Sequence, residues 1–119
     1  MEFGARGSRS FLAGEKEIRV LFTNRALAEI EGAVGKSILE IANGFSDGKT
    51  GIRDTAIMLR FGMEASRRDN RDGGRSITLE DAYKVLDEVG FATVISEIMP
   101  AIVEVLTPVE DDEDTDNPK

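Results

Sequence analysis

The sequence predicts a mostly α-helical domain of the α+β class, in which a short N-terminal β-hairpin precedes about five helices packed as a small helical domain. Near the start, Ile18, Val20 and Phe22 alternate with Glu17 and Arg19, and this period of two is typical of a half-buried strand. After this strand, apolar residues recur every three or four positions, which indicates helices. No later segment has the pattern of a crossover strand. A chain of 119 residues is long enough to bury one hydrophobic core.

Composition divides the chain into three parts. We expect a flexible arm over residues 1–10, a single domain over 11–107 and a disordered acidic tail over 108–119. Positions 110 to 119 carry six acidic residues and one lysine, and mutual repulsion of these charges opposes compaction. Most of the net charge of −8 therefore lies outside the predicted domain.

One glycine predicts the turn of the hairpin. Gly14 supplies the turn between a short strand around Phe11 and Leu12 and the strand over 17–22. A ribbon of two strands is only marginally stable by itself. The hairpin must therefore pack against the helices that follow it.

Capping residues predict the first two helices. Thr23 or Asn24 offers an N-cap for the first helix, and Gly35 is its expected stop. Ser37 caps a short second helix that ends near Gly44. The apolar positions of these helices are Ala26, Leu27, Ile30 and Val34 in the first, and Ile38, Leu39, Ile41 and Ala42 in the second.

Two further helices are separated by a polar segment. The third helix begins at about Ile52, and residues 66–76 read as a polar loop because they are rich in arginine and aspartate. Thr78 with Asp81 three residues later is a variant of the capping box and opens the fourth helix. Gly90 is expected to end that helix.

The last helix is predicted over 92–106, with Pro100 inside it, so we expect a kink or a break there. Its apolar residues cover more than one face. Ordinary core packing explains such a pattern, and the alternative is a surface for self-association or for a hydrophobic helical client. The candidate partner-binding residues are Ile95, Ile98, Met99, Ile102, Val105 and Leu106.

The chain has no histidine, cysteine or tryptophan. Histidine is the commonest general acid or base near neutral pH, and cysteine is the usual thiolate nucleophile. Their absence excludes Ser-His and Cys-His nucleophilic pairs and Cys/His zinc sites. We therefore expect no enzyme, no catalytic residue, no metal ligand and no cofactor.

Charge and hydropathy limit the partners. The acidic balance argues against binding to nucleic acid, which requires clustered lysine and arginine. No apolar run approaches the about 20 residues that span a bilayer, and no secretory signal is visible, so we expect no membrane partner and a cytoplasmic location.

Two local motifs resemble ligand-binding loops without their chemistry. Residues 70–81 resemble an EF-hand loop, but Arg75 stands where the loop needs glycine, and Asp81 replaces the bidentate glutamate. Residues 48–50 form Gly-Lys-Thr, but Asn43 stands where a phosphate-binding loop has its first glycine. We interpret both segments as ordinary loops.

Five segments in order carry a resemblance to a known family. They are 17–23 (EIRVLFT), 24–31 (NRALAEIE), 37–42 (SILEIA), 57–63 (IMLRFGM) and 77–82 (ITLEDA). This series resembles the small tail assembly chaperones of long-tailed bacteriophages and their relatives in gene transfer agents. The resemblance spans about residues 11 to 106.

The resemblance implies a non-enzymatic chaperone in the bacterial host cytoplasm. Such proteins coat the long, helical tape-measure protein before tail-tube subunits polymerise around it, so the implied partners are the tape-measure protein, the tail-tube subunit and further copies of the chain. The family has no catalytic residues to carry over. Two alternatives stay open, a structural minor tail component of the virion and a cytosolic adaptor whose acidic tail occupies a basic partner.

Overall fold

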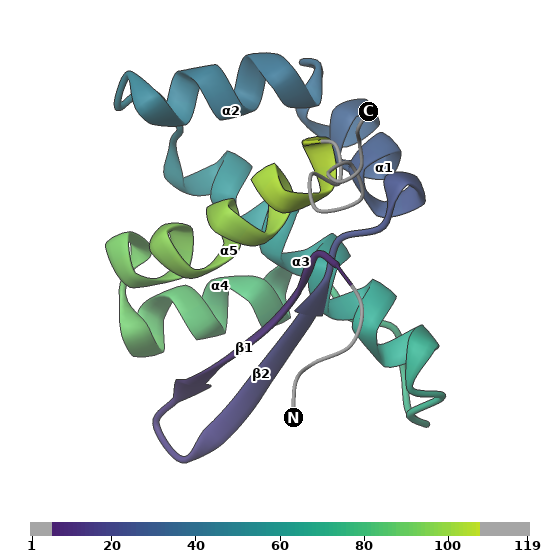
Figure 1. The fold of residues 1–119 in the computed structure, drawn as a ribbon. Helices are drawn as coiled ribbons and strands as arrows, with labels where there is room; N and C mark the ends of the chain where they lie inside the picture. Colours follow the sequence, from purple (N-terminus) through teal and green to yellow (C-terminus); the bar gives the residue numbers. More distant parts are fainter. Residues whose placement is uncertain (1–5, 108–119) are drawn as a thin grey trace, which may run out of the picture.

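The computed structural model describes residues 6–107 and confirms a hairpin followed by helices (Figure 1). The predicted tail over 108–119 and the first five residues of the predicted arm lie outside the described residues. The elements in chain order are β1 (Ser8–Ala13), β2 (Lys16–Leu21), α1 (Asn24–Val34), α2 (Ile38–Ser46), α3 (Ile52–Asp69), α4 (Leu79–Val89) and α5 (Phe91–Leu106).

The hairpin is antiparallel, and its register runs from Ser8 opposite Leu21 to Ala13 opposite Lys16. Gly14 has a φ of 63° at the tight turn, a conformation that favours glycine and confirms its predicted role. β1 begins at Ser8, so the predicted end of the arm at residue 10 is wrong. Residues 8 to 10 are ordered because they pair with β2, and the sequence of β1 alone does not contain that information.

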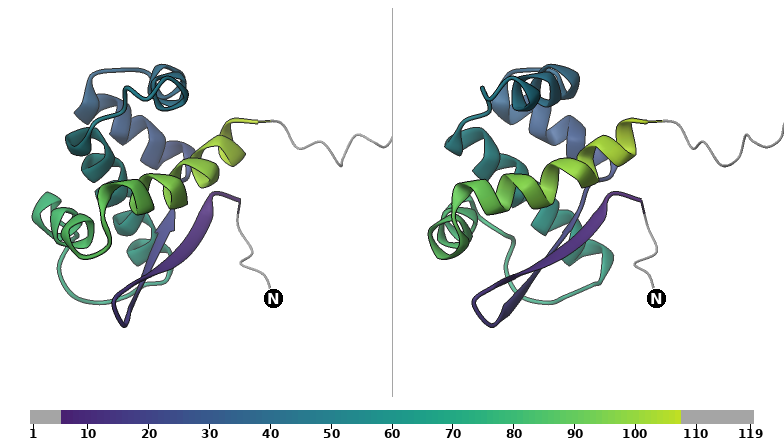
Figure 2. Two further views of the ribbon diagram at one scale, coloured as in Figure 1. Left: turned by 90° about the vertical axis from the view of Figure 1, so that its left-hand side faces the viewer. Right: turned by 60° about the vertical axis from the view of Figure 1, so that its left-hand side comes forward.

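α3 packs against one face of the hairpin and contacts β2, α1, α4 and α5 (Figure 2). The buried side chains of Val20 and Phe22 face it, and both are only 1% exposed. Gly62 is the point of closest approach, because a Cβ built there would lie 2.6 Å from Phe22 Cζ and 3.1 Å from Val20 Cβ. The glycine in the middle of α3 therefore lets the hairpin sit directly on the helix.

The predicted caps at the helix ends are confirmed. Thr23 Oγ1 accepts a hydrogen bond from Ala26 N at 3.0 Å, and Gly35 ends α1 with a φ of 84°. Ser37 caps α2. The capping box of Thr78 and Asp81 is complete, since each side chain accepts a hydrogen bond from the backbone of the other residue.

One expectation about a helix end needs correction. α3 continues to Asp69, so the first four residues of the predicted loop over 66–76 are helical. Ion pairs of Glu64 with Arg67 and Arg68 stabilise this last part of the helix. At Pro100, where we expect a kink or a break, no break occurs, because α5 runs through it as one helix. Pro100 is exposed, so water can reach the carbonyl that loses its helical donor.

Within residues 6–107, no single helix has both the length and the apolar character needed to cross a membrane. α4 and α5 reach that length and composition only together, and they are bent by 115° at their junction.

Candidate protein-binding surfaces

The predicted partner surface on α5 is mostly inside the molecule. Ile95, Ile98, Met99 and Ile102 are between 0% and 6% exposed and belong to the hydrophobic core. Val105 and Leu106 are half-buried against the same core. In the folded domain these six residues therefore lie in or against the core, and the partner-binding role expected of them stays a prediction. Core packing, the alternative left open by the sequence, accounts for their burial, because α5 is covered by β1, α3 and α4.

Large apolar side chains are instead exposed around α2. Leu39 is 62% exposed, Ile52 at the start of α3 is 56% exposed, and Phe45 is 38% exposed. We call Leu39, Phe45 and Ile52 the α2 surface. α2 packs chiefly on α1, and Ile38 and Ile41 are the residues that it buries there. It therefore carries apolar side chains both on its buried face and on its exposed face. Figure 1 shows α2 at the opposite end of the molecule from the hairpin turn.

Short contacts hold α2 in place. Glu31 accepts a hydrogen bond from Ile38 N at 2.8 Å, which fixes the connection from α1. Lys49 N donates to Gly44 O at 2.6 Å, and Thr50 Oγ1 donates to Ile41 O at 3.4 Å. These bonds fold the loop after α2 back along the helix and bring the start of α3 beside it. A helix, rather than a strand, thus precedes the Gly-Lys-Thr segment, so the loop lacks the setting of a phosphate-binding loop.

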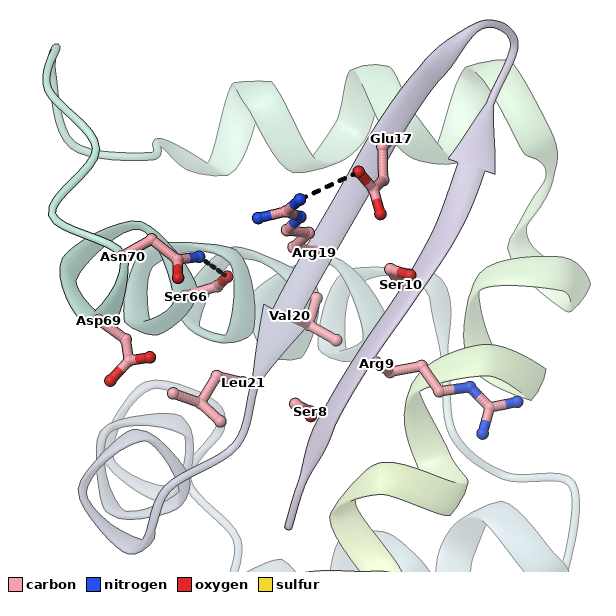
Figure 3. Close-up of a pocket in the computed structure, with 10 residues that line it drawn as sticks. All are labelled: Ser8, Arg9, Ser10, Glu17, Arg19, Val20, Leu21, Ser66, Asp69 and Asn70. Atoms are coloured by element: carbon pink, nitrogen blue, oxygen red, sulfur yellow. Dashed lines mark hydrogen bonds and ion pairs between the residues drawn. The ribbon is translucent and has the colours of Figure 1, made fainter. Parts of the chain in front are cut away.

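A groove whose lining residues are mostly polar lies beside the hairpin (Figure 3). It has a volume of about 330 Å³, and we call it the β2 groove. Arg19 and Glu17 form an ion pair of 3.4 Å on β2, and Asn70 Nδ2 donates to Ser66 Oγ at 3.4 Å on the end of α3. The groove is lined by Ser8, Arg9, Ser10, Glu17, Arg19, Val20, Leu21, Ser66, Asp69 and Asn70.

Glu64 is a buried acidic side chain that several hydrogen bonds hold in place, and the sequence patterns did not point to it. It is 5% exposed, and it accepts two hydrogen bonds from Arg67 at 3.0 and 2.7 Å and one from Arg68 at 2.9 Å. It also accepts a bond from Ile77 N at 2.8 Å. The Arg67 hydrogen bonds outweigh the cost of burial and lower the pKa of Glu64 to about 2.

These contacts show that Glu64 organises the fold. It joins α3 to the segment before α4, and Arg60 adds a bond from its Nε to Ile77 O at 3.2 Å. The spacing of Glu64 with Arg67 and Arg68 was the available signal in the sequence, because residues three and four apart meet on a helix.

Asp81, the last residue of the EF-hand-like segment, accepts hydrogen bonds from neighbouring residues of the protein. Arg75 donates two hydrogen bonds to its carboxylate at 2.7 and 2.9 Å, and Thr78 N donates a third at 2.9 Å. The Arg75 bonds hold the pKa of Asp81 well below its usual range. Among residues 6–107, no group of three or more acidic, histidine or cysteine side chains could hold a metal ion.

Comparisons with protein-family models, with curated proteins and with solved structures gave no match to the chain. The α2 surface and the motifs of the sequence are therefore the features that bear on function.

Proposed function

We propose that the chain is a tail assembly chaperone of the long-tailed phage type, which binds the tape-measure protein without catalysis and keeps it soluble in the host cytoplasm. The α2 surface is the observation that carries the proposal. It exposes Leu39, Phe45 and Ile52 on and beside a helix that packs chiefly on one neighbour. The family resemblance supplies the client, a long helical protein that is prone to aggregate.

The chemistry of the α2 surface suits an amphipathic helix. Such a helix binds by placing apolar side chains against apolar side chains of its receptor. Burying one leucine, isoleucine or phenylalanine contributes roughly 1.5–3 kcal/mol, and the cost of association consumes much of the total from three residues. One copy of the chain therefore binds the client weakly. Many copies along one client hold it firmly together, while each single copy can still be displaced. That behaviour fits a chaperone that yields its place to tail-tube subunits.

Co-expression with the tape-measure protein tests the proposal. The wild-type chain is expected to keep the client in the soluble fraction and to co-purify with it. The double variant Leu39→Asp with Ile52→Asp should leave the client insoluble, because both side chains are exposed and their replacement removes apolar contact without opening the core.

Leu12→Asp is the control for a single added charge outside the α2 surface. Leu12 is 65% exposed, but it lies on β1, so the variant adds a charge at a comparable site away from α2. It should protect the client as well as the wild-type chain does. If Leu39→Asp with Ile52→Asp retains full client protection and a wild-type melting temperature, the α2 surface does not bind the client.

A further inference from the structure

The outer edge of β2 carries backbone groups that the hairpin does not use. Phe22 N donates to Gly7 O at 2.9 Å just beyond the paired strands, while Gly7 N donates to Glu104 Oε1 at 3.0 Å, and the first of these bonds places Gly7 opposite Phe22 in the phase of a hydrogen-bonded pair. Hydrogen-bonded and non-hydrogen-bonded pairs alternate along an antiparallel ladder. In the observed register, Glu17 and Arg19 therefore belong to non-hydrogen-bonded pairs, and their N–H and C=O groups point away from β1.

This part of the edge is open. Beyond the hairpin, no group within residues 6–107 hydrogen-bonds to the backbone of Glu17 or Arg19. Their side chains are 49% and 58% exposed. Figure 3 shows β2 between β1 and the end of α3, with the β2 groove along it. Proteins usually protect such an edge, because it is a template for another strand.

The charges on this edge are self-complementary. Glu17 and Arg19 lie on either side of Ile18 and carry opposite signs. When a second β2 is placed antiparallel with Ile18 opposite Ile18, each Glu17 faces Arg19 of the second copy. Both residues have outward-facing backbone groups, so this register also satisfies the alternation of the ladder. Opposite charges in directly facing positions stabilise a strand pair.

We propose that the open edge of β2 pairs with β2 of a second copy of the chain and forms a continuous four-stranded sheet across a two-fold axis. The pairing uses the same surface on both copies, as a two-fold dimer requires. An unrelated extended peptide could hydrogen-bond to the same backbone groups. A second copy of the chain also places an arginine opposite Glu17 and a glutamate opposite Arg19, so it matches the charges as well. The inference does not involve the α2 surface and stands independently of the chaperone proposal.

Charge-reversal variants of the full chain test the pairing through its dissociation constant, measured by sedimentation equilibrium. Glu17→Arg places like charges opposite one another at both ends of the strand pair, and so does Arg19→Glu. Each variant should weaken self-association by about tenfold or more, because two attractive pairs become repulsive. Both side chains are exposed, so the melting temperature of the dilute protein should stay close to that of the wild type.

Mixing the two variants separates pairing between copies from the ion pair within β2. In a mixture of Glu17→Arg and Arg19→Glu, every arginine faces a glutamate of the other variant, so association should return to near the wild-type level. The variant that carries both changes should also associate like the wild type. Arg9→Glu is the control, because it changes net charge as Arg19→Glu does but lies on β1, where it contacts Glu97 at 3.1 Å. It should leave association unchanged.

Several results would overturn the proposal. They are a wild-type chain that stays monomeric at high concentration, single variants that associate like the wild type, and a mixture that fails to restore association. Loss of association in Arg9→Glu equal to that in Arg19→Glu would also overturn it, because net charge would then account for the effect.

Discussion

Replacing Gly62 by alanine tests the packing of the hairpin on α3. The added Cβ would lie 2.6 and 2.8 Å from ring atoms of Phe22 and 3.1 Å from Val20 Cβ. Phe22 and Val20 are each 1% exposed, so neither can move aside without disturbing the core. Overpacking of this kind costs about 1–3 kcal/mol, and it competes with a gain of up to about 1 kcal/mol from the better helix propensity of alanine. We expect Gly62→Ala to lower the free energy of unfolding by roughly 1–2 kcal/mol.

Gly32→Ala is the matched control for this prediction. Gly32 also lies within a helix, but a Cβ there meets no atom within 4 Å. This variant should gain stability by up to about 1 kcal/mol, because only helix propensity changes. Urea unfolding followed by circular dichroism measures both effects. If Gly62→Ala is as stable as Gly32→Ala, the close approach of β2 to α3 is not as described.

Two further changes test the remaining features of the fold. Ionised Glu64 has a pKa of about 2 in the folded protein, below its ordinary value, so it stabilises the fold above that ordinary value and loses this contribution as the pH falls toward 2. Urea unfolding should show that the free energy of unfolding falls by roughly 2 kcal/mol between pH 7 and pH 3 because of this group. Glu64→Gln should remove most of this pH dependence and should be less stable than the wild type at pH 7. An identical pH dependence in both proteins would contradict the low pKa of Glu64. Pro100→Ala restores a helical hydrogen bond at an exposed position of α5 and should raise the free energy of unfolding by about 1–3 kcal/mol, whereas a decrease would mean that proline suits this position.

Local chemistry made the elements predictable. A cap or a turn depends on a few neighbouring residues, and the positions of Gly14, Gly35, Ser37 and Thr78 matched the structure for that reason. The end of α3 was harder, because its last turns contain polar residues that resemble a loop. Burial of Glu64 with its arginine partners decides that segment, and burial depends on the rest of the fold.

Surfaces were less predictable than elements. Periodicity identifies apolar faces of a helix, but it does not say which face another element covers. Most apolar residues of α5 are covered by β1, α3 and α4, and only Val103 among its large ones is as much as 41% exposed, whereas Leu39 of the shorter α2 is 62% exposed. To identify the open edge of β2, one must know which residues of the hairpin form hydrogen-bonded pairs, and the alternation of residues along a strand does not contain that information.

The most direct test of the central claim is the mass of the complex formed with the tape-measure protein, measured by light scattering after co-expression and purification. A tail assembly chaperone should form a soluble complex with several copies of this chain on each client, and that complex should be lost in Leu39→Asp with Ile52→Asp but not in Leu12→Asp. A client that stays insoluble while the chain is found in finished tails would contradict the chaperone function and would favour a structural component of the virion.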